Sequence, residues 1–172
     1  MRLRWFGLLL FALLAATALY VAQAGEDKDK SHPDKGEMKH VVVMPDELKW
    51  GPAPPGLPPG AKLAIIVGDP KKAVPYVFRA KFPDGYKVMP HWHPVDENVT
   101  VLKGTFFMGT GEKFDMKAGM ELPPGGFSHM PKGTKHFAMA KGETMIQVHG
   151  VGPFEIHYVN PADDPRKKSE SK

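Results

Sequence analysis

After residue 40 the chain alternates between short apolar segments and turn residues. From Tyr76 to Phe82, apolar side chains alternate with Val77, Arg79 and Lys81. A period of two is typical of a strand with one buried face. Further short apolar segments lie at residues 40–44, 62–67, 99–102, 105–108, 127–130, 136–140, 144–149 and 154–159. Evenly spaced short strands predict an all-β sandwich or barrel.

Glycine, proline and aspartate mark the turns that we expect between these segments. The predicted turns lie at residues 69–70, 83–85, 103–104, 109–111 and 141–142. We expect Gly85 and Gly104 to adopt positive φ angles in hairpins. The proline-rich stretch 54–60 cannot be a central strand, because proline donates no ladder hydrogen bond, so it predicts a covering loop. No segment after residue 24 predicts an amphipathic helix of about ten residues or more.

The first 24 residues have the pattern of a secretory signal peptide. Arg2 and Arg4 precede an apolar run over residues 5–21, and Ala22-Gln23-Ala24 supplies the small residues of a cleavage site. The alternative is a retained membrane anchor, but a run of about 17 residues is at the short limit for spanning a bilayer. We expect cleavage after Ala24, no membrane contact afterwards, and a periplasmic or secreted protein.

The remaining chain has two polar ends around one apolar middle. Residues 25–40 are rich in charge and predict a mobile leader, and residues 161–172 predict a charged, flexible tail. Residues 41–160 have the length of one domain. Hydrophobic residues make up 42% of the whole chain, which is enough for a single core.

Composition and charge exclude several functions. The chain has no cysteine, which removes disulfides, thiolate metal ligands and cysteine nucleophiles. Its formal net charge is +4, of which Arg2 and Arg4 in the predicted signal peptide contribute two. Basic residues form no stripe with interleaved aromatic side chains, so we predict no nucleic-acid partner.

Histidines are the candidate chemical groups. His91 and His93 are two residues apart, so on a strand their side chains share a face. Glu97 follows closely enough to return to the same cavity after a bend, and His136 lies on a separate predicted strand. Imidazole nitrogens and a carboxylate suit manganese, iron, nickel, copper or zinc better than calcium or magnesium. Taken alone, the His-x-His pair fits two surface histidines equally well.

Two spaced motifs surround these residues. Residues 85–104 fit the pattern G-x5-H-x-H-x3-E-x6-G, and residues 125–136 fit G-x5-P-x-G-x2-H. The chain thereby resembles the cupin family, over roughly residues 61–159. Ala140 departs from the family pattern, in which the second motif usually ends in asparagine. That position is not a metal ligand in the family.

The resemblance implies a single-domain jelly-roll β-barrel of cupin type with a mononuclear metal site. By transfer of the motif positions, His91, His93, Glu97 and His136 are the ligands of one divalent transition metal. The metal is zinc, copper, manganese, iron or nickel, with open positions for a substrate. Glu97 is also a candidate catalytic acid or base, if it can swing away from the metal.

The other histidines are weaker candidates. His149 shares a face of its predicted strand with Met145 and Gln147 and could support the ligands as a base, but an outward or core position is the alternative. His129 and His157 are further candidates for a pocket role. His32 and His40 lie in or beside the predicted leader and are expected to have no role. Trp92 should point away from its neighbouring histidines. We expect five methionines to pack in the core and not to bind copper. They are Met89, Met108, Met130, Met139 and Met145.

Several functions remain open at this point. The protein could be an exported oxidoreductase of dioxygenase type that acts on a small chelating organic substrate, or a metal-dependent isomerase or lyase. It could instead be a non-enzymatic protein of the cell envelope that binds a metal or a small ligand, which a narrow, closed cavity would favour. A chain that folds outside the cytoplasm is expected to acquire zinc or copper. Cupin edge strands often pair between subunits, so a homodimer is a further expectation.

Overall fold

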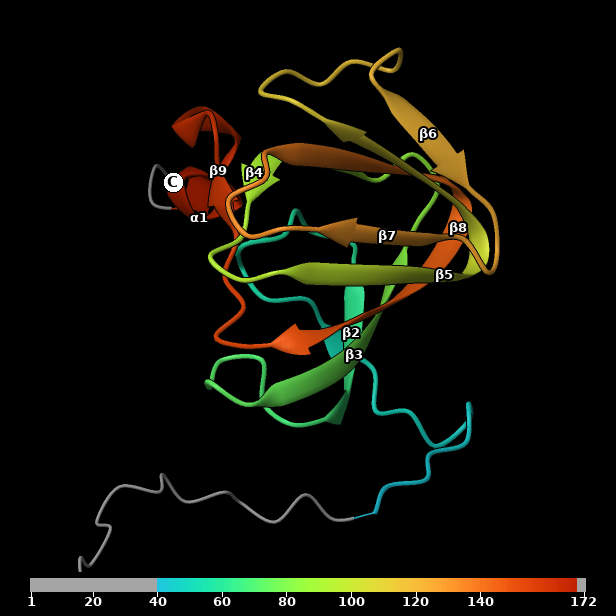
Figure 1. Cartoon of the computed structure of the whole chain (residues 1–172). Coiled ribbons are helices and arrows are strands. Elements are labelled where there is room, and N and C mark those ends of the chain that lie inside the picture. The colour runs from blue at the N-terminus through green and yellow to red at the C-terminus, as the bar shows by residue number, and fades with distance from the viewer. Residues whose placement is uncertain (1–39, 170–172) are drawn as a thin grey trace, which may run out of the picture. The chain divides into compact units, whose positions relative to one another are not determined.

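The computed structural model describes residues 40–169. The predicted signal peptide and residues 25–39 of the predicted leader lie outside the described residues. Strands are the main regular elements of the described chain (Figure 1). They are β1 (Gly51–Pro52), β2 (Lys62–Val67), β3 (Pro75–Phe82), β4 (Lys87–Trp92), β5 (Glu97–Thr110), β6 (Gly119–Leu122), β7 (Phe127–Met130), β8 (His136–Val151) and β9 (His157–Tyr158). In residues 40–169 no helix is both long enough and apolar enough to span a bilayer.

Antiparallel pairing joins these strands into one curled sheet. The order along the sheet is β1-β2-β3-β8-β4-β9, and β5 pairs with β6, β7 and β8. The long strand β8 is central, because it pairs with β3, β4 and β5. Figure 1 shows the sheet curling so that β5 and β7 face β2 and β3 across an interior. The predicted all-β jelly-roll barrel is confirmed.

The two longest strands bend without ending, which corrects two predicted turns. β5 continues through Lys103-Gly104, and β8 continues through Lys141-Gly142. Gly104 has the expected positive φ, of 75°, but the pairing of β5 with β8 shifts register between Val101 and Lys103 and again between Lys103 and Thr105. Gly104 therefore forms a bulge inside a continuous strand instead of a hairpin. A Cβ atom at Gly104 would lie 2.5 Å from the carbonyl oxygen of Glu143, so only glycine fits there.

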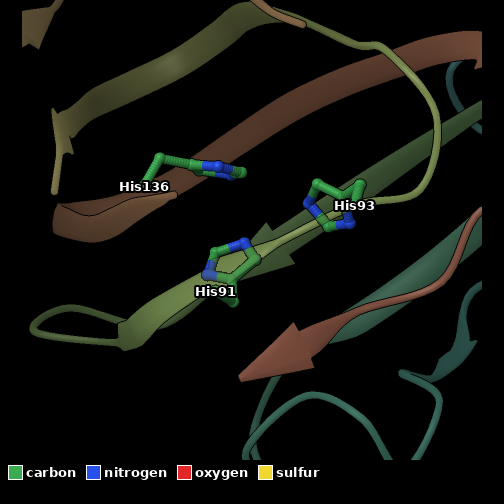
Figure 2. Close-up of side chains that lie close together, drawn as sticks. All are labelled: His91, His93 and His136. Carbon is green, nitrogen blue, oxygen red and sulfur yellow. The ribbon is translucent and has the colours of Figure 1, made fainter. Parts of the chain in front are cut away.

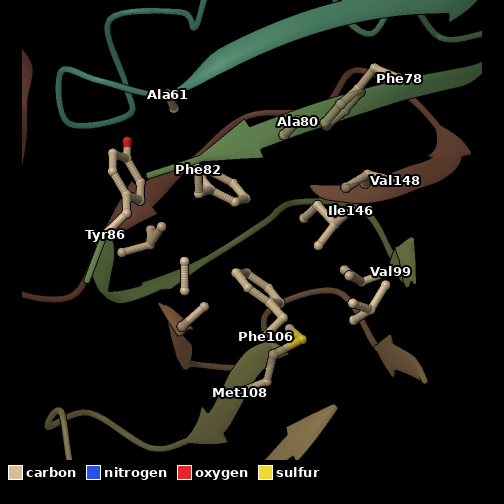
Figure 3. Packing of buried hydrophobic residues seen from close by; sticks show 14 of the residues in the cluster. Ala61, Phe78, Ala80, Phe82, Tyr86, Val99, Phe106, Met108, Ile146 and Val148 are labelled. Atoms are coloured by element: carbon tan, nitrogen blue, oxygen red, sulfur yellow. The ribbon is translucent and has the colours of Figure 1, made fainter. Parts of the chain in front are cut away.

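The inward faces of β3, β5 and β8 form the core. On β3 the predicted alternation is observed, since Tyr76, Phe78, Ala80 and Phe82 are all buried. The Phe82 ring stacks on Phe106 of β5 with 5.6 Å between ring centroids. Figure 3 shows Phe78, Phe82 and Phe106 directed from the surrounding strands toward a shared interior.

Residues before β2 differ from expectation. The predicted strand over residues 40–44 is not formed, and Val41, Val42 and Met44 are exposed. Apolar composition alone does not produce a strand where no neighbouring strand offers hydrogen bonds. Trp50 packs on the sheet, and the Nζ atom of Lys81 lies 4.1 Å from the centroid of its ring. The proline-rich stretch 54–60 forms turns between β1 and β2, as predicted.

The end of the described chain differs from expectation in its regular structure. The predicted strand over residues 154–159 is reduced to β9. Of the predicted tail over residues 161–172, residues 170–172 lie outside the described residues, and residues 161–169 contain regular structure. They form a 3₁₀ turn, η1 (Pro161–Asp163), and a short helix, α1 (Pro165–Ser169). The buried carboxylate of Asp164 accepts hydrogen bonds from the backbone N–H of Arg166 at 3.0 Å and from its guanidinium group at 2.8 Å. This pair orders the segment between β9 and α1.

Candidate metal centre

Three imidazoles and one carboxylate meet inside the barrel. His91 lies on β4, His93 follows that strand, Glu97 begins β5 and His136 begins β8. Figure 2 shows the three imidazole rings gathered between β4 and β8. One ring nitrogen from each histidine lies within 4.8 Å of the other two. All four side chains are buried, and the exposed fraction of Glu97 is only 7%.

The turn before β8 joins the two sequence motifs. The backbone N–H of Gly133 donates to the carbonyl oxygen of His93 at 2.8 Å, and that of Thr134 donates to Pro131 at 3.0 Å. Gly133 has a φ of 76°, which favours glycine over other residues. This tight turn delivers His136 to the position opposite His91 on the paired strand.

Each imidazole is oriented by a backbone carbonyl group. The Nδ1 atoms of His91, His93 and His136 lie 2.8, 2.6 and 3.0 Å from the carbonyl oxygens of Met89, Glu155 and Thr134. A carbonyl oxygen only accepts, so each Nδ1 must carry the proton and donate. In the neutral ring, each Nε2 atom then keeps a free lone pair. Histidines that bind metals are commonly oriented in this way.

The Nε2 atoms meet the Glu97 carboxylate. Glu97 Oε2 lies 3.3 Å from His136 Nε2 and 3.7 Å from His93 Nε2. The Nε2 atom of His93 is buried and has no hydrogen-bond partner among the described residues. A buried polar atom without a partner is costly, whereas a cation at this point would use its lone pair. The donor set therefore fits a divalent transition metal.

Burial and mutual charge shift the pKa values of these groups. Burial lowers the pKa of His91 well below its usual range and also lowers that of His93. Burial also lowers the pKa of His136, but the hydrogen bond and charge of Glu97 outweigh this effect and raise it overall. For Glu97, burial raises the pKa, but His93 and His136 outweigh burial and bring it to about 2. At neutral pH the site thus presents a carboxylate anion and at least two neutral imidazoles.

The segment after β8 supplies two contacts that sequence reasoning missed. Phe154 stacks on the ring of His93 with 4.3 Å between centroids, and Glu155 contributes the carbonyl oxygen that orients the same ring. The Glu155 side chain points elsewhere, since its Oε2 lies 3.1 Å from Nε2 of His157. Any residue carries a backbone carbonyl, so no side-chain pattern could have revealed this contact.

A cavity opens beside the four candidate ligands. Its volume is about 430 Å³, and its walls come from strands β2, β3, β4, β5 and β8 together with the loop at residues 54–57 and residues 154–156. His91, His93, Glu97 and His136 all line it. Volumes of about 300–1,000 Å³ are usual for sites that bind small organic ligands. The four groups are thus accessible to a small molecule.

The structure does not bring the other described histidines to the cavity; these are His40, His129, His149 and His157. Ile146 and Val148 of β8 line it, so the alternating His149 lies on the opposite face, beside Asn98 of β5. His129 Nδ1 lies 2.9 Å from Asn98 Oδ1, and His157 stacks on Trp92 with 4.4 Å between ring centroids.

Among the methionines singled out in the sequence, Met108 is buried and lines the cavity. Met130 packs against the core, as predicted for methionines.

Comparisons with known proteins agree with this architecture. The RmlC-like cupin from Shewanella frigidimarina NCIMB 400 is 12% identical, with a TM-score of 0.51 over 65% of this chain and 90% of its own. The polyketide cyclase RemF from Streptomyces resistomycificus is 17% identical, with a TM-score of 0.59 over 77% of this chain and 94% of its own. KdgF from Halomonas sp. is 21% identical, with a TM-score of 0.51 over 66% and 96% of the two chains. At these identities the likeness shows the fold alone.

The protein therefore has the cupin fold, with three histidines positioned to bind a metal. The chain belongs to the family described as "Domain of unknown function (DUF4437)", whose model matches residues 42–170. No curated protein matches the chain in sequence.

Proposed function

We propose that the protein is a metal-dependent enzyme that acts on a small organic molecule bound in the cavity. The observation that carries this proposal is the convergence of ring nitrogens from His91, His93 and His136, with the Glu97 carboxylate beside two of these rings, on the wall of a cavity of about 430 Å³. His91, His93, Glu97 and His136 would hold the metal, as the motif spacing predicts. A bound metal would polarise an oxygen atom of the substrate and, for iron, copper or manganese, support redox chemistry.

Among metal-dependent reactions we propose oxidoreductase chemistry of dioxygenase type. Isomerases and lyases need a side chain that moves protons at the substrate. Glu97 is the candidate at the site, but its Oε2 atom is held between His93 and His136. The strand walls beside the candidate ligands are apolar, and the other two carboxylates that line the cavity, Asp69 and Glu155, already contact Lys72 and His157. This arrangement supports a reaction in which the metal and dioxygen supply the chemistry.

A non-enzymatic binding role is less well supported by the cavity. A protein that only stores a metal needs no ligand space beside it, and a narrow, closed cavity would favour that role. Here the cavity is large enough for an organic molecule and is bordered by loop residues 54–57 and 69–71 at its mouth. Export through the signal peptide at residues 1–24, acquisition of zinc or copper outside the cytoplasm, and a homodimer remain parts of the proposal.

Oxygen uptake by the metal-loaded protein tests the proposed activity. The protein is loaded separately with iron(II), manganese(II), copper(II) and zinc(II) and incubated in air with small catechols and β-diketones. We expect oxygen uptake with at least one redox-active metal and none with zinc. The variant His136→Ala should abolish uptake, and His149→Ala should preserve it. Substrate loss without oxygen would instead indicate isomerase or lyase chemistry, and metal binding without substrate loss would indicate a binding protein.

A further inference from the structure

We infer that the ligand of this cavity is an apolar molecule with chelating oxygen atoms at one end only, and not a carbohydrate or amino acid. The inference rests on the proposed function, because the chelating end would meet the metal. The inference goes further by naming the class of substrate, which follows from where the polar and apolar walls of the cavity lie.

The walls away from the candidate ligands are apolar. Phe78, Phe106, Met108, Ile146 and Val148 face the interior from β3, β5 and β8 and line the cavity (Figure 3). Ile65 of β2 continues this wall to the mouth, where 53% of its surface is exposed. A large aliphatic side chain that stays exposed at a cavity rim marks a surface that a ligand can cover. An apolar body would gain affinity in proportion to the apolar area that it buries here.

The charged residues that also line the cavity are occupied elsewhere. Asp69 accepts a hydrogen bond from the backbone N–H of Lys71 at 3.0 Å, and its carboxylate lies 3.7 Å from Lys72 Nζ. Glu155 pairs with His157 at 3.1 Å. Both carboxylates therefore already have polar partners in the absence of a ligand.

The two cationic lining residues are no better placed. The Arg166 guanidinium binds Asp164 and the carbonyl oxygen of Ile156. Lys71 is exposed at the mouth, where water competes with any ion pair and leaves it little strength.

A polyhydroxylated ligand would therefore find few partners. Its hydroxyl groups would lose water and face Phe78, Phe106 and Ile146 without hydrogen bonds. Each unpaired hydroxyl weakens binding by about tenfold. The same reasoning applies more strongly to a charged ammonium or carboxylate group placed against these walls. Only the end near His91, His93 and Glu97 can satisfy polar atoms, so the polar atoms of the ligand belong there.

Two catechols with different bodies test this inference. Isothermal titration calorimetry compares 4-tert-butylcatechol with protocatechuate, in which a carboxylate replaces the tert-butyl group, and with the polar enediol ascorbate. Zinc-loaded, full-length protein is used without oxygen, so no turnover interferes. We expect 4-tert-butylcatechol to bind at least about tenfold more tightly than either polar probe, and to lose this affinity in the metal-free protein.

A matched pair of variants locates the binding surface. Ile65→Thr replaces apolar rim surface by a hydroxyl and should weaken 4-tert-butylcatechol binding about threefold or more. Val151→Thr makes a similar change at a strand residue that is 57% exposed and does not line the cavity, and it should leave binding unchanged.

The outcomes separate this inference from the proposed function. If zinc is retained but protocatechuate or ascorbate binds as tightly as 4-tert-butylcatechol, the apolar substrate class is wrong and the metal site stands. The apolar substrate class is also wrong if Ile65→Thr and Val151→Thr bind 4-tert-butylcatechol with the same affinity. If the wild-type protein retains none of iron, manganese, copper and zinc, the proposed function itself fails.

Discussion

His91 and His136 are directly paired residues of the antiparallel strands β4 and β8, and their ring centroids lie 4.2 Å apart. The two residues come from different motifs and lie 45 positions apart in the chain, so sheet pairing, and not local sequence, brings them together. Because β4 and β8 are hydrogen-bonded to each other, their backbones hold the two imidazoles at this distance. Such a site is preorganised for a metal ion.

Removing the Tyr76 hydroxyl should stabilise the protein. Tyr76 is buried, and its hydroxyl group has no hydrogen-bond partner among the described residues. A buried hydroxyl without a partner retains its desolvation cost, so Tyr76→Phe should raise the free energy of unfolding by about 1 kcal/mol. Urea denaturation measures the change.

The matched control for that variant is Tyr86→Phe. Tyr86 is also buried, but its hydroxyl donates to the carbonyl oxygen of Pro58 at 2.5 Å. Its loss should lower the free energy of unfolding by about 1 kcal/mol. Equal effects of the two variants would contradict the distinction between a partnered and an unpartnered hydroxyl.

Gly104 should tolerate alanine much less well than Gly142. Both glycines have positive φ, 75° and 69°, so alanine costs each about 1–2 kcal/mol of backbone strain. Only Gly104 has no space for a Cβ atom, which would lie 2.5 Å from Glu143 O and 2.9 Å from Thr144 Cα. At Gly142 no atom lies within 4 Å of that position. Thermal unfolding should therefore show a clearly larger loss for Gly104→Ala, and similar losses would argue against the bulge in β5.

Phe154 should contribute to metal affinity through the position of His93. Its ring stacks on the imidazole of His93. The neighbouring Glu155 carbonyl oxygen accepts a hydrogen bond from Nδ1 of the same imidazole. Phe154→Leu should weaken metal binding by about tenfold, as is usual when a support of a ligand residue is lost. The control is Phe82→Leu, because Phe82 is buried against Tyr86 and Phe106 and stacks on no imidazole. Equal metal affinities of the two variants would exclude the positioning role.

The Asp164–Arg166 pair predicts a pH-dependent contribution to stability. The hydrogen bond from Arg166 lowers the pKa of the Asp164 carboxyl below its usual value of 3.8. When folding lowers the pKa of a carboxyl group, the ionised carboxylate stabilises the folded state at pH values above the unfolded-state pKa. This contribution is lost as the pH falls through the folded-state pKa. Wild type should therefore exceed Asp164→Asn in unfolding free energy at pH 7, with the difference shrinking below about pH 4. A difference that stays constant from pH 7 to pH 3 would contradict this assignment.

The sequence predicted the fold and the four clustered residues because two spaced motifs resemble those of the cupin family. His91 and His93 share a face through the period of two, but only the pairing of β4 with β8 brings His136 beside them. Strand alternation did not distinguish the inner face from the outer one. His149 therefore stayed a candidate until the cavity-lining positions of Ile146 and Val148 were known.

Other features depend on contacts between distant segments, which the sequence pattern does not contain. Lys103-Gly104 has the composition of a turn, yet β8 continues to pair with β5 on both sides of it. The Glu155 carbonyl orients His93 from 62 positions away. The apolar residues 40–44 lack a neighbouring strand and stay irregular.

Metal content is the most direct test of the central claim that His91, His93, Glu97 and His136 hold one metal ion. Elemental analysis by mass spectrometry compares the wild-type protein, His93→Ala, His136→Ala and the control His129→Ala, which alters an exposed histidine outside the cavity. We predict about one transition-metal ion per chain in the wild type and in His129→Ala, and a loss of most of it in the other two variants. A wild-type protein without metal, or equal metal in all four proteins, would contradict the claim.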